Sequence, residues 1–213
     1  TAYEIRPRDW SSDVCSSDLL ANYPTRDGRI ANGVGYDTPA STIAILGAMA
    51  KAGYRVEHLP TDGNDLIAKL QQARPARGGG AALPLADYRA HFECLPEPAR
   101  QAVSGRWGRP EDDPFFRAGE FLLPVRLHGN VAVAIQPSRG YDIDPKATYH
   151  DPALVPPHGY LAFHFWLRHR FGAHAVIHNG KHGNLEWLPG KAHALTSACF
   201  PEIALGPLPQ IYP

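Results

Sequence analysis

One segment near the end of the chain gathers side chains that could bind a metal ion or transfer protons. It contains two imidazoles, one carboxylate and two lysines between glycines: His178, Lys181, His182, Glu186 and Lys191. Glycine allows backbone conformations that other residues resist, so these side chains can converge. Imidazole and carboxylate are also ligands that borderline divalent metals such as cobalt, zinc and nickel accept. Metal handling or acid–base chemistry is therefore the first hypothesis.

The spacing of His178, His182 and Glu186 leaves the use of these residues open. Steps of four residues would place all three on one face of a helix. Gly180 and Pro189 instead favour a loop, in which the histidines could simply cap strand ends or bond backbone carbonyls. The spacing alone does not decide between a metal site and a structural role.

The segment HNGKHGNLEWLPGK, residues 178–191, closely resembles the signature of the cobaltochelatase large subunit (CobN type) and of the related H subunit of magnesium chelatase. Further blocks that resemble this family follow one another along the chain: LANYPTRDGR, NGVGYDTP, QPSRGY, YHDP with PPHGY, CFPE and LGPLP. The resemblance covers most of the chain but only an inner portion of a much longer family protein.

The resemblance implies an activity. Family members insert a divalent metal into a tetrapyrrole, while separate AAA+ ATPase and integrin-domain subunits hydrolyse ATP. For the CobN type it implies Co(II) as the substrate metal and hydrogenobyrinic acid a,c-diamide as the acceptor in cobalamin biosynthesis. One alternative is an H-type subunit that inserts magnesium into protoporphyrin IX. Another is a tetrapyrrole-binding module without independent catalysis.

The resemblance also implies roles for the residues of the signature. Glu186 can accept ring protons and touch the incoming metal. A neutral His182 can relay a proton or act as a transient ligand, because its reference pKa lies near neutrality. We expect the metal to be bound by His178, His182 and Glu186. Asn179 stands where the family tends to have a small or apolar residue.

A second set of residues suits the substrate. Arg139, with Tyr141 beside it, could hold a substrate carboxylate by a bidentate pair, although an ordinary ion pair is the alternative. Lys181 and Lys191 suit the acidic side chains of a corrinoid precursor. Trp187 could stack on a flat ligand. We therefore expect these five residues to bind the substrate.

Several functional classes are disfavoured. The chain has 213 residues, with 21 Lys and Arg against 21 Asp and Glu, so no basic field favours nucleic acid or a membrane surface. No apolar run could span a bilayer, no signal peptide is apparent, and the three cysteines include no Cys-x-x-Cys pair, which fits a cytoplasmic protein. Neither a P-loop nor a His-Glu-x-x-His zinc motif occurs.

The elements that must position these residues alternate between strand and helix. We expect strands at 19–23, 54–59, 131–135 and 173–177, and helices at 38–53, 86–103 with a break at 95–98, 159–170 and 193–200. This order predicts an α/β fold with a parallel or mixed sheet, flanking helices and Rossmann-like halves, within a larger multidomain protein. Ligands of such sheets bind at the carboxyl ends of strands, where the motifs fall.

The chain divides into four expected segments. Residues 1–19 are expected to be non-native or disordered, residues 20–71 an α/β half-domain, residues 72–120 a linker with irregular and helical parts, and residues 121–213 the α/β segment with the signature. The tandem Ser-Ser-Asp of SSDVCSSDL, residues 11–19, stands where the family would have an apolar strand. It resembles an assembly or adapter artefact, and a polar loop is the alternative.

Overall fold

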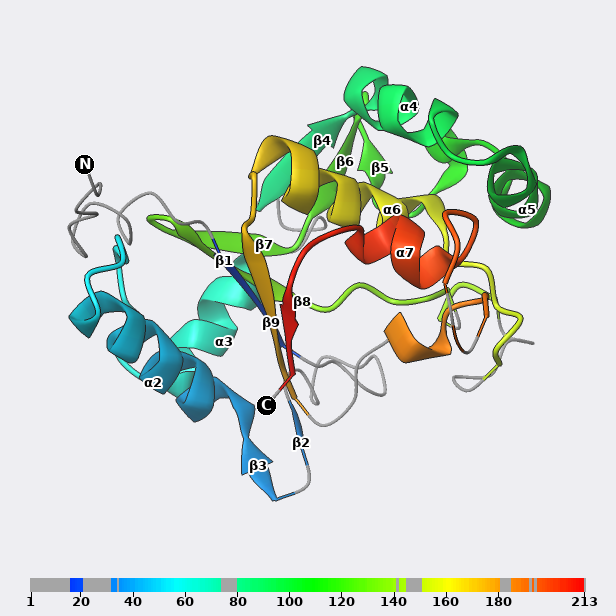
Figure 1. Ribbon diagram of the computed structural model, residues 1–213. Helices are drawn as coiled ribbons and strands as arrows, with labels where there is room; N and C mark the ends of the chain where they lie inside the picture. Colours follow the sequence, from blue (N-terminus) through cyan, green and yellow to red (C-terminus); the bar gives the residue numbers. More distant parts are fainter. Residues whose placement is uncertain are drawn as a thin grey trace, which may run out of the picture.

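The computed structural model describes residues 16–20, 32–33, 35–73, 80–140, 142–144, 151–180, 185–191, 193 and 195–212. A five-stranded sheet lies between two layers of helices (Figure 1). Its order is β10 (Gln210–Ile211), β9 (Ala175–Asn179), β1 (Ser16–Leu20), β8 (Val131–Ile135) and β7 (Val125–His128). All neighbours pair in parallel except β7 and β8, which are antiparallel. The predicted α/β class with a mixed sheet is confirmed, whereas the Rossmann-like halves stay a prediction.

The centre of the sheet consists of one strongly apolar strand and one unexpected strand. All five residues of β8 (VAVAI) are buried, which is typical of a strand covered on both faces. The neighbouring β1 pairs with β8 on one side and β9 on the other. Residues 16–19 of the segment expected to be non-native therefore lie in the central strand, and residues 1–15 lie outside the described residues. The division into four segments stays a prediction.

Two helices cover one face of this sheet. Helix α2 (Thr38–Lys51) is capped by Asp37, whose carboxylate accepts the Ala40 N–H at 3.0 Å. Helix α3 (Gly63–Gln72) was not predicted, although Asp62 caps it in the same way. Both helices pack on alternate residues of β8 in one cluster: Leu20, Leu46, Leu66, Leu70, Val131, Val133 and Ile135.

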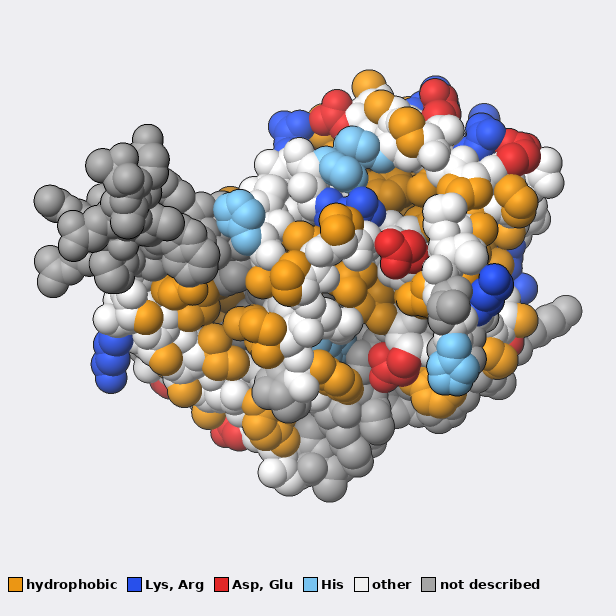
Figure 2. All heavy atoms as spheres, in the orientation of Figure 1, with side chains coloured by type: hydrophobic (Ala, Val, Ile, Leu, Met, Phe, Trp, Pro, Cys, Tyr) orange, Lys and Arg blue, Asp and Glu red, His pale blue; other side chains and the backbone are white. Residues whose placement is uncertain are grey.

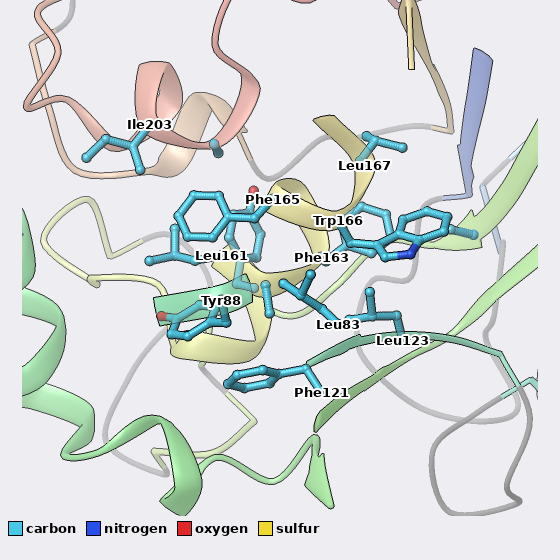
Figure 3. Close-up of a cluster of buried hydrophobic side chains, with 14 of the residues drawn as sticks. Leu83, Tyr88, Phe121, Leu123, Leu161, Phe163, Phe165, Trp166, Leu167 and Ile203 are labelled. Atoms are coloured by element: carbon cyan, nitrogen blue, oxygen red, sulfur yellow. The ribbon is translucent and has the colours of Figure 1, made fainter. Parts of the chain in front are cut away.

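The second face carries the larger core (Figure 3). It is formed by α6 (His158–Phe165), the π-helical turn η4 (Trp166–Arg170), α7 (Phe200–Leu205) and an antiparallel sheet of β4 (Ala81–Pro84), β6 (Glu120–Leu123) and β5 (Phe116–Arg117). Helices α4 (Leu85–Glu93) and α5 (Glu97–Trp107) flank this sheet, with the expected break between them. Phe163, Phe165 and Trp166 are buried in this core. Their aromatic rings therefore pack the interior.

Two expected elements are wrong. Residues 54–59 form no strand, because β7 occupies the position beside β8. This stretch instead accepts a hydrogen bond from the turn between β7 and β8, in which Asn130 N–H donates to Arg55 O at 2.9 Å. Within residues 72–120, expected to be a linker with irregular and helical parts, β4 pairs with β6. The last helix begins at Phe200 rather than at residue 193, with Cys199 preceding its first turn.

Three short elements complete the described structure: the hairpin of β2 (Asn32–Gly33) and β3 (Tyr36–Asp37), and the 3-10 turns η3 (Pro110–Asp112) and η5 (Leu185–Trp187). Within the described ranges, no helix combines the length and the apolar character that a membrane crossing requires.

Candidate functional site

The carboxyl ends of three parallel strands meet at one edge of the sheet. Leu20 pairs in register with Ile135 of β8 and with Asn179 of β9. The loop that leads to Arg139 and the signature loop therefore begin one strand apart, on either side of β1. This is the position at which open α/β sheets bind ligands, as the sequence predicted. The loop after β1, residues 21–31, lies outside the described residues.

Asn179 fixes the beginning of the signature loop. Its side chain is fully buried, donates to Thr42 Oγ1 at 2.9 Å and accepts from the Tyr36 hydroxyl at 2.7 Å. Thr42 lies on α2 and Tyr36 on β3. The Asn179 amide therefore joins the end of β9 to both α2 and β3. Sequence reasoning noted Asn179 only as a departure from the family. A polar residue directly after an apolar strand was the available signal for a buried hydrogen-bonding role.

Arg139 fixes the middle of the same loop. Its guanidinium is fully buried and donates to the Asp151 carbonyl at 2.9 Å and to the Trp187 carbonyl. A planar guanidinium suits this arrangement, because it presents several donors in a rigid fork. Arg139 therefore connects the segment at Asp151 with η5. Its expected contact with a substrate stays a prediction, and Tyr141 beside it lies outside the described residues.

The signature segment forms one wall of a pocket of about 750 Å³. This volume lies within the range of small-molecule sites. The pocket unites three of the expected site residues, Glu186, Trp187 and Lys191. Glu186 and Lys191 are exposed and Trp187 is half-buried, so all three can meet a ligand.

The opposite lining of the pocket comes from α7 and from the end of β10, through Glu202 and Tyr212. Figure 2 shows acidic side chains over α7 and over η5, with hydrophobic side chains between them. Such a surface combines an apolar area for a flat ring with charged groups that can hold or deprotonate it. Sequence reasoning assigned no role to either residue of this wall, although Glu202 lies in the family block CFPE.

The two walls are joined by short backbone contacts. Phe200 N–H donates to the Pro189 carbonyl at 2.9 Å. The buried Cys199 thiol accepts the Lys191 and Thr196 N–H groups, both at 3.4 Å. These hydrogen bonds, that of Lys191 first, lower the pKa of the Cys199 thiol. The signature segment and α7 therefore form one packed unit.

His178 lies behind the pocket. It is 1% exposed, and its ring meets the Tyr212 ring edge-on, with centroids 5.0 Å apart and planes at 83°. His182 and Lys181 lie outside the described residues, so the expected metal set of His178, His182 and Glu186 stays a prediction. Among the residues that are described, no three His, Cys, Asp or Glu side chains are grouped closely enough to hold a metal ion.

Two further buried histidines belong to α6. His158 lies between the Tyr88 hydroxyl, 2.5 Å from Nδ1, and the Gly108 carbonyl, 3.1 Å from Nε2. His164 is packed near Tyr160, and burial lowers its pKa to about 3. Burial lowers the pKa of His158 as well, and both rings serve the core. His150, in the family block YHDP, lies outside the described residues.

Comparison with known proteins adds evidence from sequence and from structure. A family model described as CobN/Magnesium Chelatase matches residues 19–213. The chain is 55% identical over 201 residues to the aerobic cobaltochelatase subunit CobN of Sinorhizobium sp, and 54% identical over 202 residues to that of Pseudomonas aeruginosa. Each match covers 92% of this chain but only 16% of the relative's length.

A solved structure is similar as well. The catalytic subunit of cobaltochelatase from Mycobacterium tuberculosis matches with a TM-score of 0.83 and 41% identity. The match covers 98% of this chain and 18% of that chain. The fold described above therefore recurs as one part of a much longer chain.

Proposed function

Because this chain belongs to the CobN/magnesium chelatase family, we propose that a protein containing it inserts Co(II) into a tetrapyrrole. Membership confirms the resemblance found in the signature and in the blocks around it. The observation that carries the proposal is the pocket of about 750 Å³, because Glu186, Trp187 and Lys191 line it together.

Cobalt is favoured over magnesium by the relatives. The two CobN proteins that are 54–55% identical to this chain are both named as subunits of aerobic cobaltochelatase, and the similar solved structure is named as the catalytic subunit of cobaltochelatase. Nitrogen ligands also suit cobalt better, because magnesium prefers oxygen. We propose hydrogenobyrinic acid a,c-diamide as the acceptor, within cobalamin biosynthesis. Magnesium insertion into protoporphyrin IX is the alternative.

The pocket residues suit the steps of this reaction. The N–H bond of the corrinoid ring must break before the macrocycle can bind the metal through four nitrogens. Glu186 is an exposed carboxylate on the pocket wall and can accept such a proton. Trp187 can stack on the macrocycle, and Lys191 can pair with its acidic side chains. Arg139 supports this wall from behind, through the Trp187 carbonyl.

The remaining roles follow from the family. We propose that His182 relays protons or binds the metal transiently, with His178, and that Lys181, Tyr141 and Arg139 assist in substrate binding. As the family resemblance implies, ATP would be hydrolysed by separate AAA+ and integrin-domain subunits in the cytoplasm. The complete assembly would be a ligase that forms nitrogen–metal bonds, and the isolated chain would be inactive.

The test uses the longer protein that contains this chain. Hydrogenobyrinic acid a,c-diamide is titrated while its absorption is recorded, and Co(II), ATP and partner subunits are then added. We expect binding first and a cobalt-dependent spectral change second. Glu186→Gln should keep the first and lose the second. Chelation of magnesium into protoporphyrin IX instead would favour the H-type alternative, and binding without any chelation would favour a binding module.

A further inference from the structure

The end of β10 contributes an aromatic ring to the pocket that carries the signature. Tyr212 directly follows this strand and lines the pocket of about 750 Å³ together with Trp187 of η5. The Tyr212 side chain is 47% exposed, and Trp187 is half-buried. A ligand that fills the pocket therefore meets one aromatic ring from each of two separate walls.

The strand itself directs the Tyr212 ring toward the pocket. In the parallel pairing with β9, Gln210 lies opposite Val176 and Ile211 lies opposite Ile177. Successive side chains of a strand point to opposite faces of the sheet. Gln210 and Tyr212 both line the pocket, whereas Ile211 between them is 52% exposed and belongs to the other face. The direction of the Tyr212 ring is therefore a consequence of the β10 backbone.

The Tyr212 ring is also held in place by a neighbour on β9. The His178 ring meets it edge-on, with centroids 5.0 Å apart and planes at 83°. His178 is 1% exposed, so this neighbour is itself fixed by the packed interior. A tyrosine ring has only two side-chain torsions, and a contact of this kind restricts both of them. Little conformational entropy is then left to lose when a ligand binds the ring.

Apolar side chains surround the two rings. Leu188, Leu195 and Leu205 line the same pocket, and Leu195 is 45% exposed. Single exposed apolar residues are common on protein surfaces, but several of them around one concave pocket indicate a ligand-binding site. A flat apolar ring system fits this lining better than a small polar ligand does.

If the proposed chelatase function holds, we propose that Tyr212 binds the tetrapyrrole by stacking its ring on the flat conjugated macrocycle. Trp187 supplies the second aromatic contact from the signature wall. Stacking uses the face of the macrocycle and requires no charged group. Lys191 is then left for the acidic side chains at the edge of the macrocycle, and Glu186 is left for the ring N–H. The two aromatic rings serve binding, and the carboxylate serves the chemical step.

A purely structural use of Tyr212 predicts a different result. In that case the ring would only cover His178, and any apolar side chain of similar size would replace it. A stacking contact requires a flat face, which phenylalanine retains and leucine lacks. Replacement by phenylalanine and by leucine therefore separates the two uses.

The experiment uses the longer protein that contains this chain. The dissociation constant of hydrogenobyrinic acid a,c-diamide is measured by absorption titration, and metal insertion is then measured with Co(II), ATP and partner subunits. Tyr212→Leu and Tyr212→Ala should each raise Kd and KM for the macrocycle roughly 10-fold, as expected for the loss of one aromatic stacking contact. The kcat at saturating macrocycle should stay within about twofold, because only binding is lost. Tyr212→Phe should behave like the wild type.

Ile211→Ala is the matched control, because Ile211 is exposed on the same strand but does not line the pocket. It should leave Kd and kcat unchanged, and circular dichroism should show that all variants are folded. Wild-type affinity in Tyr212→Leu, or an equal loss of affinity in Tyr212→Phe or in Ile211→Ala, would overturn the stacking role. Continued insertion of Co(II) by the wild type would then leave the proposed function intact, whereas a wild-type protein that binds no macrocycle would overturn both.

Discussion

Arg139 offers the sharpest test of how the site is held together. Its buried guanidinium donates to carbonyls of Asp151 and Trp187, so Arg139→Met removes the connection between two loops and leaves an apolar side chain of similar length. Hydrogen bonds from a charged group contribute roughly 1.5–3 kcal/mol each. Relief from burying a charge, which costs several kcal/mol, offsets part of this loss. We expect the free energy of local opening of residues 185–191 to fall by about 2 kcal/mol.

Hydrogen exchange followed by mass spectrometry measures this directly. A change of about 2 kcal/mol corresponds to roughly 30-fold faster exchange in the peptide that covers residues 185–191. Arg139→Lys should exchange faster still, because an ammonium keeps the buried charge but lacks the fork that reaches two carbonyls. Arg126→Met is the control, since Arg126 donates to the Lys69 carbonyl at 3.0 Å far along the chain from the signature.

Two outcomes would refute this reasoning. Unchanged exchange in Arg139→Met would show that the loop is held by other contacts. Wild-type exchange in Arg139→Lys would show that only the charge is needed. If both variants exchange faster while Arg126→Met does not, the guanidinium fork is what fixes η5 and the backbone of Trp187.

Two further perturbations test the packing around the site. Burial lowers the pKa of His164 from 6.5 to about 3, so the stability that its neutral ring contributes is present above pH 6.5 and is lost as the pH falls toward 3. In His164→Leu, the free energy of unfolding should therefore lose less as the pH falls, by an amount on the order of 4 kcal/mol at pH 3. Thermal unfolding at a series of pH values measures this, and a pH dependence identical to that of the wild type would contradict the buried position. Gly190→Ala should push α7 away from the signature, because its Cβ would lie 2.8 Å from Cys199 Cβ. Metal insertion should then fall severalfold while macrocycle binding weakens, and wild-type kinetics would show that the two walls need not touch.

Local patterns determined much of the architecture. The apolar run of β8, the proline and capping residues at the start of α2, and the apolar length of α6 each specify an element through neighbouring residues. The glycine-rich signature after β9 likewise predicted a loop at a strand end, and the structure places Glu186, Trp187 and Lys191 of this segment around one pocket. These features depend on interactions within about one helical turn or one strand, which sequence reasoning can follow.

Tertiary structure alone decided the features that depend on distant partners. The polar segment of β1 lies at the centre of the sheet because its backbone pairs with β8 and β9, and its side chains give no such signal. Residues 54–59 have a strand-like sequence but are excluded by β7. Arg139 and Glu202 have ordinary sequence surroundings, yet one is buried against carbonyls 12 and 48 positions along the chain and the other lines the pocket of the signature. Burial and hydrogen-bond partners are properties of the folded chain, because they arise only when distant segments meet.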